Sequence, residues 1–166
     1  MLHSNKLVNC EDIQSVALEI MTHPVHKLKE CDTVGAAIDK LITYRLSGLP
    51  IVNDYNEIIG FISDGDILRR IGKHKLKVID TGFYMTHFYE NSEPFEFRCD
   101  LIRHMNIMKI AKRKVVKVQS DTDIEEVSAI LAHKQIKKVP VERNGVLAGI
   151  ISRGDIIRHI YAEKLA

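Results

Sequence analysis

Two serine–aspartate pairs carry the side chains best suited to chemistry. Ser63 precedes Asp66 and Ser152 precedes Asp155, each pair within the pattern Gly-x-x-Ser-x-Gly-Asp. An ionised carboxylate only accepts hydrogen bonds, which suits the hydroxyls of a ribose, and a helix N-terminus offers N–H groups to a phosphate. The same spacing is also that of a capping box, which satisfies the helix's own N–H groups. The duplication of the pattern favours a ligand over a cap.

The duplication extends beyond these pairs, and it defines the organisation of the chain. Three stretches recur: Asp32-Thr33 as Asp121-Thr122 and residues 60–67 as 149–156, both after 89 residues, and Leu49-Pro50-Ile51 as Val139-Pro140-Val141 after 90. The one-residue difference falls in a turn, at residues 54–56 in the first copy and at Asn144-Gly145 in the second. We therefore expect two copies of one structural unit.

Each copy is predicted to have the order β-α-β-β-α. Extended stretches are expected at 25–28 and 115–118, paired strands at 49–53 with 57–62 and at 139–142 with 146–151, and last helices beginning at Ser63 and Ser152. The first helix should bury one face, made of Val34, Ala37, Ile38, Leu41 and Ile42. Its counterpart should begin with a capping box from Thr122 to Glu125. Pro50 and Pro140 suit edge positions, because neither can donate to a ladder.

A connector separates the two copies. The expected boundaries are an N-terminal segment 1–14, a first repeat 15–70, a connector 71–107 and a second repeat 108–166. The basic residues 73–77 suit a solvated helix end or loop, and residues 91–94 suit a helix start. The helix that follows should have an apolar stripe with Arg98 and Arg103 off it; the stripe consists of Phe95, Ile102, Met105 and Met108.

Composition excludes several classes of function. The chain has 166 residues, a net charge of +2 and no Trp, so nucleic acid is not expected as a partner. It has no apolar stretch long enough for a membrane helix and no signal peptide, and its three cysteines lack metal spacing, so we expect a cytoplasmic protein. Neither Ser63 nor Ser152 has a local His or Lys partner, which argues against an enzyme.

Taken together, these motifs resemble a tandem pair of cystathionine-β-synthase (CBS) domains. The matching features are Ile20-Met21-Thr22, the Asp-Thr helix starts, the Pro-containing strands and the Gly-x-x-Ser-x-Gly-Asp motifs, over about residues 15–70 and 108–161. Ala111-Lys112 stands where Met-Thr would be typical of the second copy. The resemblance implies an α/β (α+β) fold of two repeats packed face to face through their sheets. It also implies adenosine-containing ligands (AMP, ADP, ATP or S-adenosylmethionine) in clefts between the copies, regulation of a partner protein, and a homodimer.

The resemblance also assigns residues to the ligand. Asp66 and Asp155 would accept from ribose hydroxyls, Ser63 and Ser152 would contact ribose or phosphate, and the backbones of Gly48-Leu49-Pro50 and Lys138-Val139-Pro140 would line the adenine.

Charge predicts that the two sites differ. Arg153 could clamp a phosphate in the second site, and Lys112, Arg113, Lys114 and Lys117 add cations there, whereas Asp64 stands at the place of Arg153 in the first. We expect the second site to prefer a phosphorylated nucleotide. For the first site three alternatives stay open: it is empty, it binds a neutral adenosyl group, or it needs Mg²⁺ to bind a phosphate.

The leading hypothesis is a stand-alone, energy-sensing regulatory module that acts in trans and has no catalytic cofactor. The alternatives are a ligand-free interaction scaffold of the same fold and an S-adenosylmethionine sensor.

Overall fold

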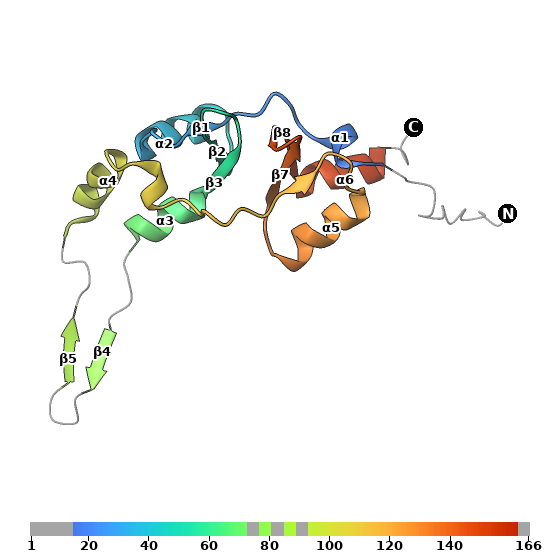
Figure 1. Ribbon diagram of the computed structural model, residues 1–166. Helices are drawn as coiled ribbons and strands as arrows, with labels where there is room; N and C mark the ends of the chain where they lie inside the picture. The colour runs from blue at the N-terminus through green and yellow to red at the C-terminus, as the bar shows by residue number, and fades with distance from the viewer. Residues whose placement is uncertain (1–14, 73–76, 81–84, 89–92, 163–166) are drawn as a thin grey trace. The chain divides into compact units, whose positions relative to one another are not determined.

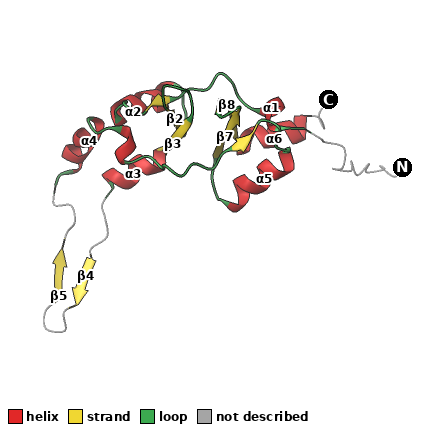
Figure 2. Cartoon of the chain, in the orientation of Figure 1, coloured by secondary structure: helices red, strands yellow, loops and turns green. Residues whose placement is uncertain are grey.

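The computed structural model describes residues 15–72, 77–80, 85–88 and 93–162. They form two compact units by contact, one made of residues 26–115 and the other of the N-terminal residues up to 25 together with 116–166. The expected fold class, mixed α+β with two three-stranded sheets, is confirmed (Figures 1 and 2). The packing of the two repeats against each other stays a prediction.

The body of the first repeat is a three-stranded sheet with a helix between its first two strands and a helix after its third. Strand β1 pairs parallel to β2, and β2 pairs antiparallel to β3. The elements are β1 (Leu28–Lys29), α2 (Val34–Thr43), β2 (Gly48–Val52), β3 (Ile58–Ser63) and α3 (Asp64–Ile71).

The second repeat has the same order and the same pairing pattern. Strand β6 pairs parallel to β7, and β7 pairs antiparallel to β8. The elements are β6 (Val118–Gln119), α5 (Ile124–His133), β7 (Lys138–Arg143), β8 (Val146–Ser152) and α6 (Arg153–Ala162). The β7–β8 turn has positive φ at both Asn144 (53°) and Gly145 (83°), as a two-residue hairpin turn requires.

At the first helix of each repeat, the two copies do not align as we expected from the Asp-Thr pairs. The side-chain N-caps of α2 and α5 are Thr33 and Asp123, which are 90 residues apart, so the identical Asp-Thr pairs are not structural equivalents. The predicted capping box from Thr122 to Glu125 is wrong. The Asp123 carboxylate accepts from the Glu125 N–H at 2.7 Å, and the Thr122 hydroxyl accepts from the Gln119 N–H at 3.0 Å instead.

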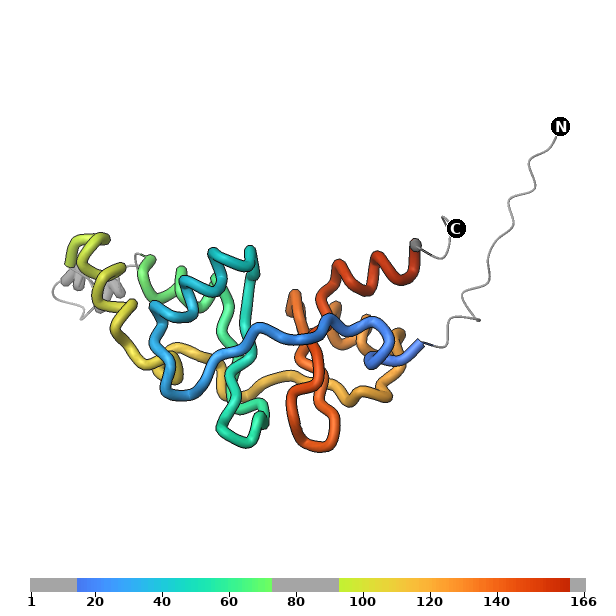
Figure 3. Tube along the Cα trace, turned by 90° about the horizontal axis from the view of Figure 1, so that it is seen from above, coloured from blue at the N-terminus to red at the C-terminus, as the bar shows by residue number. Residues whose placement is uncertain are grey.

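The segment that leads into each repeat packs in the other unit. Helix α1 (Ala17–Ile20) contacts α6 and β8, and Thr22 pairs with Ile150 of β8 through two backbone hydrogen bonds (Figure 3). Gly149 makes room for this segment, since a Cβ there would overlap the Met21 side chain. In the unit of the first repeat, Lys112 pairs with Phe61 of β3 in the same way, just after the 3-10 turn η2 (Ile107–Lys109).

The apolar stripe of α2 is confirmed except at its last residue. Val34, Ala37 and Leu41 are buried and Ile38 packs against their cluster, whereas the side chain of Ile42 is 72% exposed. The buried face of α5 consists of Ile124, Val127 and Leu131.

The connector contains the predicted helix, α4 (Phe95–Arg103), and a strand pair that the sequence analysis did not predict. Strands β4 (Lys77–Asp80) and β5 (Met85–Phe88) pair antiparallel, so Lys77 begins a strand, while residues 73–76 lie outside the described part. Two residues of the helix also differ from expectation. Phe95 is 53% exposed, and Arg98 is buried because its guanidinium donates to the backbone oxygens of Ile71 and Glu93.

Within the described residues, no helix combines the length and apolar character needed to cross a bilayer.

Candidate functional site

Both serine–aspartate pairs form capping boxes at the start of the last helix of a repeat. In the first, the Ser63 N–H and hydroxyl donate to Oδ2 of Asp66 at 3.0 and 2.6 Å. In the second, the Ser152 N–H and hydroxyl both donate to Oδ2 of Asp155 at 2.7 Å. The cap interpretation is therefore confirmed in both copies, and it uses one oxygen of each carboxylate.

The other oxygen of each aspartate faces cations. Oδ1 of Asp66 lies 3.3 Å from Nη1 of Arg69 and 3.5 Å from Nζ of Lys112. Oδ1 of Asp155 pairs with Arg158, which occupies the place of Arg69. A carboxylate has about four acceptor positions. The described contacts of Asp66 are three hydrogen bonds and the Lys112 ion pair, whereas those of Asp155 are three hydrogen bonds, which leave one acceptor position open.

The charge state of Asp66 reflects this surrounding. Burial by itself raises the pKa of the carboxyl, whose side chain is only 4% exposed. The hydrogen bonds from Ser63 and the ammonium of Lys112 outweigh burial and hold the pKa below its usual value. Asp66 is therefore a buried, ionised and fully compensated acid.

Lys112 packs in the unit of the first repeat, whereas we expected it near the first strand of the second copy. Its backbone pairs with Phe61, and the equivalent backbone in the other unit is that of Thr22, paired with Ile150. Thr22 in one unit and Lys112 in the other thus occupy equivalent positions, and only Lys112 has a long, positively charged side chain. Sequence reasoning noted that Lys112 replaces a typical Thr but missed its partner, because the contact joins residues 46 positions apart.

The N–H groups at the two helix starts are satisfied to different degrees. In α3, the N–H groups of Asp64, Gly65 and Asp66 donate to Ser47 O, Asp64 Oδ1 and Ser63 Oγ, at 3.1, 2.7 and 3.4 Å. In α6, those of Arg153 and Asp155 donate to Lys137 O and Ser152 Oγ, at 3.1 and 3.2 Å. The exposed Gly154 N–H has no hydrogen-bond partner among the described residues.

Arg153 is exposed, and its guanidinium already holds two backbone carbonyls. Nε donates to Ile136 O at 2.9 Å and Nη2 to Leu131 O at 3.2 Å. Leu131 O is among the last carbonyls of α5, which have no partner inside the helix. Arginine has five N–H donors, so three remain for another acceptor.

Lys117 forms an ion pair with Glu142, whose side chain is 10% exposed. The charge of Lys117 is thus balanced within its own unit. The sequence analysis did not identify Glu142, because this residue lies in a predicted strand and belongs to no recurring motif.

The predicted adenine-lining stretches lie next to the caps. Gly48 is the register partner of Ser63, and Lys138 is the partner of Ser152. We expected Pro50 and Pro140 at the edges of their sheets. The strands that contain them, β2 and β7, are instead the middle strands. The pairing of β1 with β2 starts only at Ile51, however, so Pro50 lies beyond it. Leu49, Pro50, Val139 and Pro140 are buried.

Two α+β units, each ending its sheet in a capped helix, define a tandem pair of β-α-β-β-α repeats. Residues 16–73 and 107–162 match the CBS domain, and the chain belongs to this family.

The similar proteins include relatives in sequence and two solved structures whose complexes contain adenosine compounds. CBSX1, a chloroplastic CBS domain-containing protein of Arabidopsis thaliana, is 24% identical over 154 residues, which are 84% of this chain and 61% of that protein. The crystal structure of CBSX2 in complex with AMP matches with a TM-score of 0.67 at 20% identity, over 90% of this chain and 98% of that one.

The CBS domain pair of protein MJ0100, in complex with 5′-methylthioadenosine and S-adenosyl-L-methionine, matches with a TM-score of 0.65 at 19% identity, over 90% and 98% of the two chains. At these identities the structural likeness shows the fold. The chain spans less than two thirds of several curated relatives, such as 31% of one from Methanocaldococcus jannaschii.

Proposed function

We propose that this chain is a regulatory module that binds an adenosine-containing nucleotide and acts in trans on a partner protein. The observation that carries the proposal is the cap of the second repeat. There Asp155 is ionisable, 14% exposed and has one acceptor position unused by the described residues. A ribose hydroxyl is a neutral donor that fits this position.

The surroundings of Asp155 suit the rest of a nucleotide. The Gly154 N–H at the start of α6 is available to a phosphate, and Arg153 keeps donors beside it. The strand start at Lys138-Val139-Pro140, which is in register with Ser152, would face the adenine. The complexes of CBSX2 with AMP and of the MJ0100 domain pair with S-adenosyl-L-methionine support an adenosyl ligand.

The test is calorimetric titration of the full chain with AMP, comparing Asp155→Asn with wild type. An asparagine can keep its carbonyl oxygen on the Ser152 donors, while its amide replaces the acceptor Oδ1 by a donor. We expect AMP affinity to fall by on the order of tenfold or more, since a hydrogen bond to a charged group contributes roughly 1.5–3 kcal/mol.

The matched control is Asp121→Asn, an exposed aspartate of the same unit that is not part of the cap. It removes the same charge and should bind AMP like wild type. If wild type binds no AMP, ADP, ATP or S-adenosylmethionine, the proposal is wrong. Binding of S-adenosylmethionine in preference to AMP would instead identify an S-adenosylmethionine sensor.

A second candidate function is a ligand-free interaction scaffold, and the first repeat favours it. The Asp66 carboxylate is surrounded by three hydrogen bonds and an ion pair from its own chain, as expected for a purely structural cap. A scaffold would show no thermal stabilisation by any adenylate. A ligand at about 100 times its dissociation constant should add about 2.7 kcal/mol.

We also propose that two copies of the chain pair, as the family resemblance implies. The last helices carry exposed apolar side chains suited to such contact: Leu68 is 62% exposed, and Ile157 and Tyr161, one turn apart, are 56% and 52% exposed. Sedimentation of the wild type should give a dimer and that of Ile157→Asp a smaller species. A monomeric wild type would contradict pairing without affecting the nucleotide proposal.

A further inference from the structure

We propose that Lys112 determines which repeat binds nucleotide: its ammonium takes the last acceptor position of Asp66, which closes the first site to ribose and leaves Asp155 as the binding aspartate. This inference rests on the proposed function, and it names the residue that makes two duplicated caps unequal.

Three hydrogen bonds and one ion pair surround the Asp66 carboxylate. Oδ2 receives the two Ser63 donors, and Oδ1 faces Arg69 at 3.3 Å and Lys112 at 3.5 Å. An ionised carboxylate accepts about four hydrogen bonds, so a ribose hydroxyl must displace one of these groups. Displacing a Ser63 donor would break the cap, which leaves the two cations as the groups to be displaced.

Arg69 does not distinguish the two repeats. Its equivalent, Arg158, pairs with Oδ1 of Asp155 in the same i, i+3 relation. The distinguishing group is at the position of Lys112, which in the other unit is Thr22. The backbones of both residues are held by a pair of hydrogen bonds to the strand that leads to the cap, Lys112 to Phe61 at 2.9 and 3.0 Å and Thr22 to Ile150 at 2.9 and 3.1 Å.

A neutral hydroxyl is a poor replacement for the Lys112 ammonium. The ammonium places a full positive charge beside the carboxylate, which a neutral hydroxyl does not supply. The Asp66 side chain is 4% exposed, so water could do little to replace the lost charge of Lys112. Lys112 itself is 56% exposed, and the two backbone hydrogen bonds to Phe61 place the base of its side chain next to the cap.

The experiment exchanges the two residues. Calorimetric titration with AMP is carried out on the full chain for wild type, Lys112→Thr, Thr22→Lys and the double exchange. We expect a single AMP per chain in wild type, a second AMP in Lys112→Thr, and loss of binding in Thr22→Lys. The double exchange should bind a single AMP whose affinity is lost with Asp66→Asn and unchanged with Asp155→Asn, the reverse of wild type.

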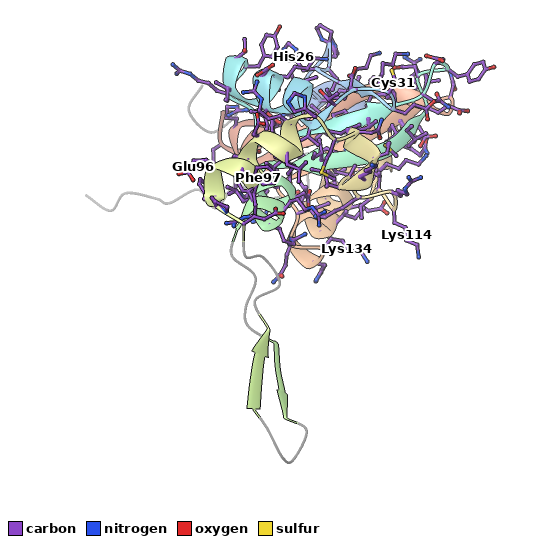
Figure 4. The ribbon with its side chains drawn as sticks, turned by 90° about the vertical axis from the view of Figure 1, so that its left-hand side faces the viewer. His26, Cys31, Glu96, Phe97, Lys114 and Lys134 are labelled. Atoms are coloured by element: carbon purple, nitrogen blue, oxygen red, sulfur yellow. The ribbon has the colours of Figure 1, made fainter. Side chains whose placement is uncertain are left out.

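The matched control is Lys134→Thr. Lys134 is exposed at the end of α5 (Figure 4), and its substitution removes the same charge. It should keep a single AMP per chain, so a general loss of positive charge would be recognised. Unfolding curves of each variant show whether it is folded, and Lys112→Thr alone decides the question if Thr22→Lys does not fold.

Two results would overturn the inference while leaving the proposed function intact. One is wild type that already binds AMP at both repeats, and the other is Lys112→Thr that still binds a single AMP through Asp155. Absence of AMP binding in wild type, Lys112→Thr and the double exchange alike would instead overturn the proposed function, and this inference with it.

Discussion

Asp66 and Asp155 occupy the same position of two duplicated helix caps, yet their side chains are 4% and 14% exposed and their Oδ1 atoms face two cations and one. Each repeat is therefore an internal reference for the other. If the same substitution is made at Asp66 and, separately, at Asp155, an effect common to both reports the role of the cap in the fold. An effect at one aspartate alone reports the role of that site.

The low pKa of Asp66 predicts that acid weakens the fold. In the unfolded chain the pKa of this carboxyl is about 3.9, and in the folded chain it is lower, so the unfolded state binds more protons at pH values between the two. The stabilisation by Asp66 is thus fully present above the unfolded pKa and is lost as pH falls through the folded one. The free energy of unfolding, measured with urea, should therefore decrease as the pH is lowered from about 6 to about 3.

Lys112→Thr should reduce this pH dependence, because removing the ammonium raises the folded-state pKa of Asp66 toward its unfolded value. Lys134→Thr, which changes the net charge equally, should keep the wild-type dependence. Equal pH dependence of Lys112→Thr and wild type would show that the Lys112 ammonium does not act on Asp66 in solution.

The position of Gly149 predicts a difference between two equivalent glycines. A Cβ at Gly149 would overlap the Met21 side chain, whereas a Cβ at the equivalent Gly60 would lie 3.3 Å from Ile51 Cδ1 and 3.5 Å from Met108 Cε. Gly149→Ala should lower the free energy of unfolding by about 1–3 kcal/mol through overpacking. Gly60→Ala should cost clearly less. Equal costs in urea unfolding would contradict the packing of Met21 on Gly149.

The repeat was largely predictable from the sequence because it rests on local signals. Apolar spacing predicted α2, Asn144-Gly145 predicted a tight turn, and Ser-x-x-Asp predicted the starts of α3 and α6. The register at the start of the repeat was not predicted correctly. The sequence analysis aligned the two identical Asp-Thr pairs, whereas the equivalent N-caps are Thr33 and Asp123. A side-chain oxygen at the N-cap, rather than residue identity, is what the helix start requires.

The parts of the site that could not be predicted depend on contacts distant in sequence. The pairing of Lys112 with Asp66, of Lys117 with Glu142 and of Arg153 with the carbonyls of α5 follows from chain paths that no local pattern encodes. Arg98 shows the same limit. The helical pattern placed it on the solvent face, but two backbone carbonyls bury it.

Arg98 predicts a structural role for the connector. Its guanidinium, which also lies 5.8 Å from the Phe95 ring, joins the end of α3 at Ile71 to Glu93 before α4. Arg98→Met should lower the free energy of unfolding by about 1–3 kcal/mol, because the carbonyls of Ile71 and Glu93 lose a donor.

The control for this prediction is Arg103→Met. Arg103 is 55% exposed and 3.7 Å from Asp39, so its loss should change the free energy of unfolding by less than about 0.5 kcal/mol. Arg98→Met that unfolds at the same urea concentration as Arg103→Met would show that the buried guanidinium contributes nothing net.

Arg153 predicts a separation of stability from nucleotide binding. Its Nε and Nη2 hold Ile136 O and Leu131 O, so a lysine, which lacks the planar fork, should lower the free energy of unfolding by about 1 kcal/mol. The three remaining N–H donors are available to a phosphate. AMP affinity should then fall several-fold in Arg153→Lys, whereas adenosine, which has no phosphate, should bind as it does to wild type.

The comparison of AMP with adenosine makes the Arg153 prediction specific, because a purely structural arginine would change both affinities alike. Arg143→Lys, an exposed arginine at the end of β7, should change neither affinity nor stability. If Arg153→Lys loses stability while its AMP and adenosine affinities shift equally, Arg153 serves only the end of α5. The phosphate would then depend on the Gly154 N–H, whose position at the start of α6 does not depend on that side chain.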